Sequence, residues 1–282
     1  MIAILLATII NIQPAFDFLN TEPFFTVPVA TDTGIAAVNR NPAGLTSKRS
    51  FLFSSTDWIS DAGISTFQFN WNNFGLAINY YRFGRVEYQD RTPDDYTSVF
   101  FNPYAYEVKL GKSFRVDPEL KVGIMVHYFR QTILNSSADG FYSSIGLLYT
   151  PAMIKNFSAG VSFENIGFKK GFINLLYRAP IQGNIGVSYT YKNFKFDWNF
   201  SKVLTYEGAF ESLFKGDVRN FVQVSSSVKS ICLGGGYEFG NDASPFVVWI
   251  ALKKSVVKIA AGIRPGTQGF DNFKTINLQL EI

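Results

Sequence analysis

The sequence predicts an all-β protein: a closed antiparallel transmembrane β-barrel of about 14 strands with an N-terminal plug segment. Three observations predict this fold class. Apolar and polar residues alternate with a period of two, aromatic residues make up 17% of the 282 residues, and short and long links alternate between the predicted strands. In a barrel wall, alternate side chains face the lipid and the lumen. Such barrels also have aromatic girdles and alternating short turns and long loops, so one architecture accounts for all three observations.

The alternation is clearest between residues 194 and 201, where a helical period of 3.6 residues cannot sort the side chains. One set is Phe194, Phe196, Trp198 and Phe200, and the other is Lys195, Asp197, Asn199 and Ser201. We expect the first set to face lipid and the second to face the lumen. The same pattern predicts strands near 51–58, 63–71, 74–83, 104–114, 120–132, 140–150, 156–166, 180–191, 194–203, 218–229, 231–239, 245–253, 255–264 and 274–282.

The links between these strands favour a barrel with both chain ends on the side of the short turns. Short links such as Asn72-Asn73 alternate with longer ones, of which 84–103 and 204–217 are the longest. A soluble β-sandwich is the alternative, but its core would not be lined by Ser, Asn, Gln and single charges. We expect an interfacial girdle of aromatic residues near the strand ends, formed by Trp58, Trp71, Phe74, Tyr104, Tyr149, Tyr189, Tyr191 and Phe246.

Composition limits the other classes of protein. A mean hydropathy of +0.07 is too polar for a helical membrane protein. The net charge of +4 is spread singly along the chain, so we expect no nucleic-acid partner. Residues 1–15 have the apolar core of a signal peptide, although a basic start is missing. A single cysteine, Cys232, excludes a disulfide framework, and we interpret it as a small apolar strand residue.

The chain therefore divides into a signal peptide at 1–15, an N-terminal plug segment at 16–50 and a transmembrane barrel at 51–282. The plug segment lacks strand periodicity and ends in the motif Asn41, Pro42, Ala43, Gly44 and Leu45. Pro42 fixes φ, and Gly44 permits a turn that other residues resist, so the chain can fold back inside a lumen. The alternative for this motif is a surface turn.

With this motif directly before the first strand, the sequence resembles the FadL-like superfamily of 14-stranded outer-membrane barrels, and within it most closely the PorV/PorQ family. The glycine-rich stretch before the motif is reduced, and the chain ends in Ile282 where many bacterial barrels end in Phe. The resemblance implies a bacterial outer-membrane protein in contact with outer-membrane lipid. It also implies passage of hydrophobic small molecules or partnership with a type IX-like secretion apparatus, with a general porin-like diffusion channel as the alternative.

The residues that could form a catalytic or ligand-binding site give little support to an enzymatic function. We expect no cofactor and no metal. The only histidine, His127, is predicted on the lumen face, where Ser144 of the next strand can approach it. An outer-membrane hydrolase is the unfavoured alternative, because a serine near a histidine is common. Carboxylates in the loop 84–103 have no EF-hand spacing, and Gly234 to Gly236 have no nucleotide-binding pattern. By resemblance, the loop 204–217 offers a ligand-capture site at Phe210, Leu213 and Phe214.

Overall fold

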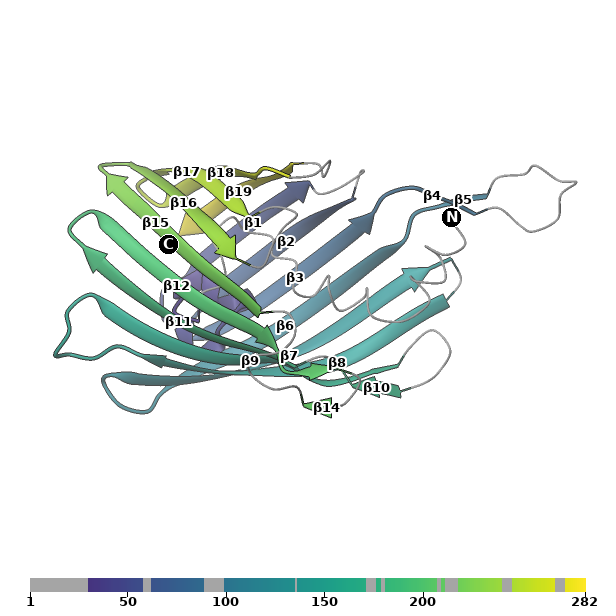
Figure 1. The fold of residues 1–282 in the computed structure, drawn as a ribbon, viewed down its shortest axis with the longest axis horizontal. Coiled ribbons are helices and arrows are strands. Elements are labelled where there is room, and N and C mark those ends of the chain that lie inside the picture. The colour runs from purple at the N-terminus through teal and green to yellow at the C-terminus, as the bar shows by residue number, and fades with distance from the viewer. Residues whose placement is uncertain are drawn as a thin grey trace, which may run out of the picture.

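The computed structural model describes residues 30–57, 62–88, 99–134, 136–170, 176–178, 181–206, 209–210, 218–239, 245–266 and 272–282. In this part of the chain, fourteen tilted strands form a closed antiparallel barrel (Figure 1). They are β1 (Ser50–Asp57), β2 (Ala62–Trp71), β3 (Phe74–Phe83), β6 (Tyr104–Arg115), β7 (Leu120–Ile133), β8 (Ser136–Tyr149), β9 (Phe157–Lys170), β11 (Gln182–Tyr191), β12 (Phe194–Val203), β15 (Val218–Val228), β16 (Ile231–Phe239), β17 (Phe246–Lys254), β18 (Val257–Arg264) and β19 (Phe273–Glu281). The predicted all-β class and the closed barrel of 14 antiparallel strands are confirmed.

The ring closes because the first and last strands pair. β1 and β19 run antiparallel from Ser50 opposite Glu281 to Asp57 opposite Lys274. Each of the other strands pairs with the strands before and after it in the wall, including β8 with β9. Every one of the fourteen therefore has two hydrogen-bonded neighbours, which a sheet needs where no water can satisfy an edge.

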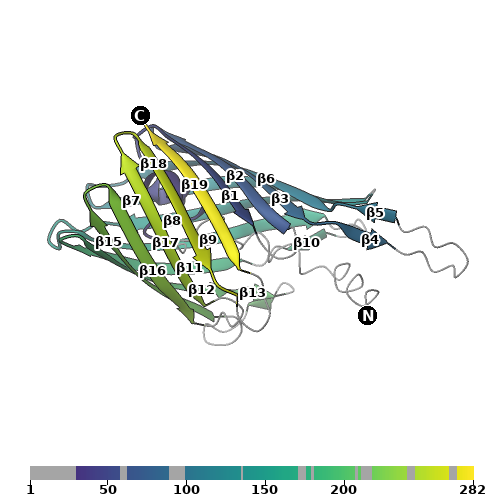
Figure 2. The same cartoon turned by 90° about the horizontal axis from the view of Figure 1, so that it is seen from above.

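Short turns lie at one end of the barrel and most of the longer links at the other (Figure 2). The exception to the predicted alternation is the two-residue link 134–135 between β7 and β8. Asn72 and Asn73, which join β2 to β3, have φ values of 50° and 64°. Two successive positive φ angles define the type I′ turn, whose twist matches that of a hairpin and which asparagine tolerates. β1 begins and β19 ends on this short-turn side, as predicted (Figure 2).

Exposure alternates along the strands as the sequence predicts. In β7, Ile124 and Val126 are exposed on the outer face, whereas Met125 and His127 are buried on the lumen face. Side chains at the strand ends supply the expected aromatic girdle. At the short-turn end Lys112 lies 4.3 Å from the ring centroid of Phe74, and towards the other end Tyr128 and Phe141 pair at 4.9 Å.

All the girdle residues predicted within the described ranges are exposed, and Trp58 lies outside those ranges. The exposed ones are Trp71, Phe74, Tyr104, Tyr149, Tyr189, Tyr191 and Phe246. Aromatic rings at both ends mark the two interfaces of the apolar band. None of the helices in the described part of the chain is long or apolar enough to cross a membrane.

Two strands, β8 and β9, extend four residues beyond their predicted loop ends, and β7 extends one residue. β7, β8 and β9 each have 14 residues, so the predicted link 133–139 shortens to 134–135 and the pairing continues into 167–170. The added ends read Ser-Ser-Ala-Asp and Gly-Phe-Lys-Lys, which lack the apolar alternation of the wall. Strand ends that extend beyond the apolar band need no apolar outer face, so the alternation underestimates their length.

Five further short strands lie in the long links. They are β4 (Val86–Tyr88), β5 (Val99–Phe101), β10 (Leu176–Arg178), β13 (Thr205–Tyr206) and β14 (Ala209–Phe210). β4 pairs with β5 and projects beyond the rim (Figure 1), β13 pairs with β14, and β10 pairs with the end of β9. These pairings extend the loop end of the barrel and leave the 14-stranded ring unchanged.

A charge on the outer face should destabilise the barrel according to its depth. Val126 lies in the middle of β7 with 55% of its surface exposed. We expect Val126→Lys to lower the free energy of unfolding by about 2–4 kcal/mol, because the ammonium group is buried in hydrocarbon. The control Val116→Lys, in the turn after β6, should cost less than about 1 kcal/mol. The measurement is the urea concentration at which heat-modifiable migration is lost; equal midpoints for both variants would contradict the assigned lipid face.

Candidate functional site in the lumen

The N-terminal segment, residues 30–49, packs against the lumen face of the wall. It forms two 3₁₀ helices, η1 (Gly34–Asn39) and η2 (Pro42–Gly44). η2 contacts β6, β7 and β8, and η1 contacts β1, β2, β3 and β6. Five consecutive residues, Asn41 to Leu45, are buried. The motif therefore lies inside the barrel, where the sequence analysis expects it, and does not form the surface turn that was its alternative.

Asn41 connects the segment to itself and to the wall. Its side-chain oxygen accepts a hydrogen bond from the backbone N–H of Ala43 at 3.0 Å, which caps η2. Its side-chain nitrogen donates to the carbonyl of Leu147 on β8 at 3.0 Å and to the carbonyl of Ala30. Pro42 follows at the first helical position, where its missing N–H costs no hydrogen bond.

Glycines of the wall make room for this segment. A side-chain carbon on Gly123 of β7 would overlap the backbone of Pro42. One on Gly146 of β8 would overlap Asn41, and one on Gly160 of β9 would overlap the carbonyl of Ala30. At these three positions on neighbouring strands the wall has no side chain. The segment can therefore approach the backbone of the wall, which only glycine permits. We call these three residues the glycine cradle.

Two further wall residues hold the end of the segment. Ser113 of β6 donates to the carbonyl of Leu45 at 2.9 Å. Asn70 of β2 donates to the carbonyl of Lys48 at 2.6 Å and accepts from the backbone N–H of Thr46 at 3.2 Å. Leu45 itself packs in an apolar cluster with Ile35, Val38, Leu52 and Met125. Polar and apolar contacts together fix the segment against β1–β8.

Filling the glycine cradle should release the segment. We expect Gly146→Val to cost about 1–3 kcal/mol by steric overlap and so raise the displaced population about 5- to 150-fold. Trypsin should then cleave after Arg40 and Lys48 at least about five times faster than in the unaltered barrel. Gly235→Val is the matched control, because a side-chain carbon at Gly235 meets nothing closer than the Val247 carbonyl oxygen at 3.5 Å. Equal cleavage rates in both variants would contradict the cradle.

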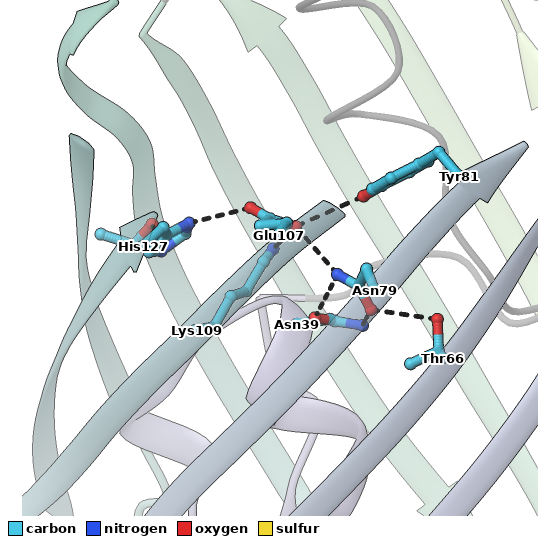
Figure 3. Close-up of polar contacts among 8 residues, drawn as sticks. Asn39, Thr66, Asn79, Tyr81, Glu107, Lys109 and His127 are labelled. Carbon is cyan, nitrogen blue, oxygen red and sulfur yellow. Dashed lines mark hydrogen bonds and ion pairs between the residues drawn. The ribbon is translucent and has the colours of Figure 1, made fainter. Parts of the chain in front are cut away.

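A network of polar side chains crosses the lumen face of β2, β3, β6 and β7 (Figure 3). Glu107 of β6 is its centre and is fully buried. Its Oε2 atom accepts from Asn79 at 2.8 Å and from Tyr81 at 3.3 Å, and lies 3.4 Å from the Lys109 ammonium. Asn79 in turn exchanges hydrogen bonds with Asn39 of η1 at 3.3 and 3.4 Å. The network therefore links the wall to the N-terminal segment.

His127 and Ser144 extend this network, as the sequence predicts. His127 Nδ1 lies 3.3 Å from Glu107 Oε1, and its Nε2 lies 3.0 Å from Ser144 Oγ. Carboxylate, imidazole and hydroxyl thus follow one another in the order used by serine hydrolases. The carboxylate also pairs with Lys109 and two neutral donors, and all three groups are buried. We interpret the chain as structural, with His127 hydrogen-bonded to its neighbours as expected.

This interpretation is tested with a fluorophosphonate, which forms a covalent bond only with an activated serine. We expect no labelling of Ser144 in the purified barrel at pH 6–9, because its hydroxyl group is buried and cannot reach the phosphorus atom. Ser144→Ala should leave heat-modifiable migration intact. Ser143→Ala, which alters the adjacent serine that donates to the Ile166 carbonyl at 3.0 Å, is the control. Labelling that disappears in Ser144→Ala but persists in Ser143→Ala would show a reactive serine.

Two apolar clusters face the lumen between the polar rows. One consists of Ile64, Tyr81, Ala105, Phe129 and Tyr142 on β2–β8. The other consists of Phe221, Val247, Trp249, Ala251 and Ala260 on β15, β17 and β18, with Cys232 of β16 packed against it. Cys232 is therefore a small strand residue, as expected. In the ring order, β17 is seven strands from β7 in either direction, so the second cluster lies across the lumen from His127.

Other predicted site residues lie partly outside the described ranges. Leu213 and Phe214 are outside them, and for Phe210 the structure gives only the backbone of β14. The carboxylates at 90, 94 and 95 are also outside, and the side chain of Glu87 is not described. Among the described residues, no group of three His, Cys, Asp or Glu residues is placed to hold a metal ion.

Sequence reasoning missed two features of this lumen. It did not identify Glu107 and Lys109 as a buried pair, although their i, i+2 spacing on one strand places both on the lumen face. It also gave no role to Gly123, Gly146 and Gly160, whose shared position on the lumen face was readable from the alternation. The partners of these residues depend on the register between strands, which the alternation alone does not give.

Comparison with known proteins gives structural matches only. No family model matches the sequence, and neither does any curated protein. The toluene transporter TbuX of Ralstonia pickettii is similar with a TM-score of 0.61 and 11% identity, covering 91% of this chain and 96% of that one. The toluene transporter TodX of Pseudomonas putida has a TM-score of 0.58 and 8% identity, covering 91% and 98%.

A FadL homologue of Pseudomonas aeruginosa is similar over 89% of this chain and 94% of that one, with a TM-score of 0.53 and 9% identity. The chain therefore shares the 14-stranded barrel fold of these three proteins. At these identities the likeness concerns the fold alone, and it extends over nearly the full length of each FadL-like barrel. The predicted closeness to the PorV/PorQ family within this group stays a prediction.

Proposed function

We propose that this protein is a bacterial outer-membrane channel through which hydrophobic small molecules pass, that it acts without catalysis, and that residues 30–49 act as its plug. The observation that carries the proposal is the pair of apolar clusters on the lumen face. A polar solute gains no free energy from contact with apolar side chains in the lumen. A hydrophobic molecule does gain free energy by leaving water for such a surface.

The plug role rests on the position of the N-terminal segment. Its two 3₁₀ helices pack inside the ring against six strands, and Asn39 joins it to the Glu107 network. A segment held by individual hydrogen bonds and by a glycine cradle can be displaced without opening the wall, because none of its residues belongs to the barrel's ladders. Displacement of the segment would then open a path along the lumen.

The similarity to FadL-like barrels supports the same proposal. TbuX and TodX are toluene transporters, and both share this fold over nearly their whole length. The predicted loop site at Phe210, Leu213 and Phe214 remains part of the proposal as the place where a hydrophobic molecule first lands. Partnership with a type IX-like secretion apparatus is the second candidate, favoured by a lumen that the N-terminal segment occupies and by the β4–β5 extension beyond the rim.

Uptake into vesicles separates these candidates. The barrel is reconstituted in vesicles whose outer leaflet contains lipopolysaccharide, which slows the entry of hydrophobic molecules. We expect uptake of p-xylene at least several times faster than in protein-free vesicles, and no swelling in an isotonic sugar solution. A variant carrying Gly146→Val should take up p-xylene faster than the unaltered barrel, because its plug is displaced.

The other outcomes contradict the proposal in different ways. Swelling in sugar without selective p-xylene uptake would identify a general diffusion channel. A folded barrel that admits neither solute, even with Gly146→Val, would favour the secretion partner. Heat-modifiable migration of each preparation shows that the barrel is folded before either result is interpreted.

A further inference from the structure

Gln68 of β2 carries a buried amide on the lumen face of the wall. The residue is 0% exposed, and neither its side-chain oxygen nor its side-chain nitrogen has a hydrogen-bond partner within the part of the chain that the structure describes. In water the same amide accepts two hydrogen bonds through its oxygen and donates two through its nitrogen. Burial that does not replace these bonds costs free energy, so something else in the structure keeps the side chain in this place.

The residues on either side of Gln68 in the wall pack against the N-terminal segment. In the register of the sheet, Gln68 lies opposite Leu52 of β1 and opposite Ala77 of β3. Both neighbours belong to the apolar cluster that includes Ile35 and Val38 of η1. Directly opposite side chains on one face of a sheet lie about 4.5–5.5 Å apart at their Cβ atoms. Gln68 is therefore surrounded across the wall by residues that η1 covers.

The neighbouring lumen positions along β2 are also joined to the segment. Asn70, on the short-turn side of Gln68, donates to the carbonyl of Lys48 at 2.6 Å. Thr66, on the other side, donates at 3.0 Å to Asn79, which is itself hydrogen-bonded to η1 (Figure 3). The segment thus lies over β2 on both sides of Gln68. The polar neighbours of Gln68 have partners, whereas its own amide atoms have none among the described residues.

The buried face of η1 is apolar. It consists of the side chains of Ile35, Ala37 and Val38, none of which has a polar atom. Docking of η1 therefore takes the Gln68 amide out of water and gives it no side-chain partner in return. When the segment is displaced, water in the polar lumen reaches both amide atoms and restores their hydrogen bonds. Gln68 thus destabilises the docked state and leaves the displaced state unaffected.

We propose that Gln68 weakens the docking of residues 30–49 and thereby sets how often the channel opens. This inference rests on the proposed function and deepens it, since it names the residue that controls release of the plug. An apolar side chain at this position would keep the segment docked for longer, and a charged one would expel it. Glutamine gives an intermediate strength of docking, in which the hydrogen bonds of Asn70 and Asn79 hold the segment over an unpaired amide.

The test measures trypsin cleavage after Arg40, which is buried while the segment is docked, in the full-length barrel in detergent. Gln68→Leu keeps a side chain of similar size and removes both polar atoms. We expect it to slow cleavage about tenfold, because the docked state no longer contains an unpaired amide. Gln68→Met removes the same atoms with a more flexible side chain and should slow cleavage similarly. Gln68→Glu should speed cleavage at least about tenfold, because a carboxylate is harder to bury than an amide.

Gln223→Leu is the matched control. Gln223 is also buried on the lumen face with a side-chain oxygen that has no partner among the described residues, but its strand, β15, is outside the six strands against which η1 and η2 pack. This variant should leave cleavage within twofold of the unaltered barrel. Heat-modifiable migration shows that each variant is folded. Unchanged cleavage in both Gln68→Leu and Gln68→Met, or equal slowing by Gln223→Leu, would overturn the proposal.

Uptake of p-xylene by vesicles separates this inference from the proposed function. We expect Gln68→Leu to slow uptake, in the opposite direction to Gly146→Val. Selective uptake by the unaltered barrel together with unchanged cleavage in Gln68→Leu would overturn the role of Gln68 and leave the channel function standing. Slowed cleavage with no uptake in any variant would uphold the effect of Gln68 on docking and overturn the channel function. Slowed cleavage with unchanged uptake would overturn the control of opening by Gln68.

Discussion

Closure of the sheet is the constraint on which the rest of this structure depends. Inside hydrocarbon every backbone N–H and C=O group needs a partner from the chain itself, and strands achieve this only in a ring without edges. Once the ring exists, each residue has one of two environments, lipid or lumen, and the period of two follows. The polar rows, the glycine cradle and the apolar clusters all occupy the inner set of positions, and the aromatic girdle occupies the outer set at its two margins.

The closed ring produces an alternation of apolar and polar residues in the sequence. This alternation was enough to predict most of the fold. The strands 194–203 and 231–239 have the bounds that alternation predicts, since both of their faces are uniform from end to end. Alternation failed at the loop ends of β8 and β9, where the outer face is no longer in lipid and polar residues are as suitable as apolar ones. The two-residue period is present only where the outer face of a strand lies in lipid, and it stops where the strand leaves the lipid.

The lumen was less predictable, because its contacts join strands that are distant in sequence. The approach of Ser144 to His127 was foreseeable, since they lie on adjacent strands of one hairpin. The bond of Asn39 to Asn79 and the contact of Asn41 with Gly146 depend on where the N-terminal segment lies within the ring. No local pattern encodes that position. Glycines and buried charges on the lumen face are nevertheless a usable signal, because neither is favoured there without a specific neighbour.

The seam between β1 and β19 has a consequence for the order of assembly. Its partners, such as Ser50 and Glu281, are separated by almost the whole length of the chain. Contacts of such long sequence separation form slowly, because a large loop must be closed before they contribute any stability. The ring is therefore incomplete until the final strand has left its site of synthesis. Before that moment β1 and β18 each have an open edge, which makes the unfinished barrel prone to pairing with other chains.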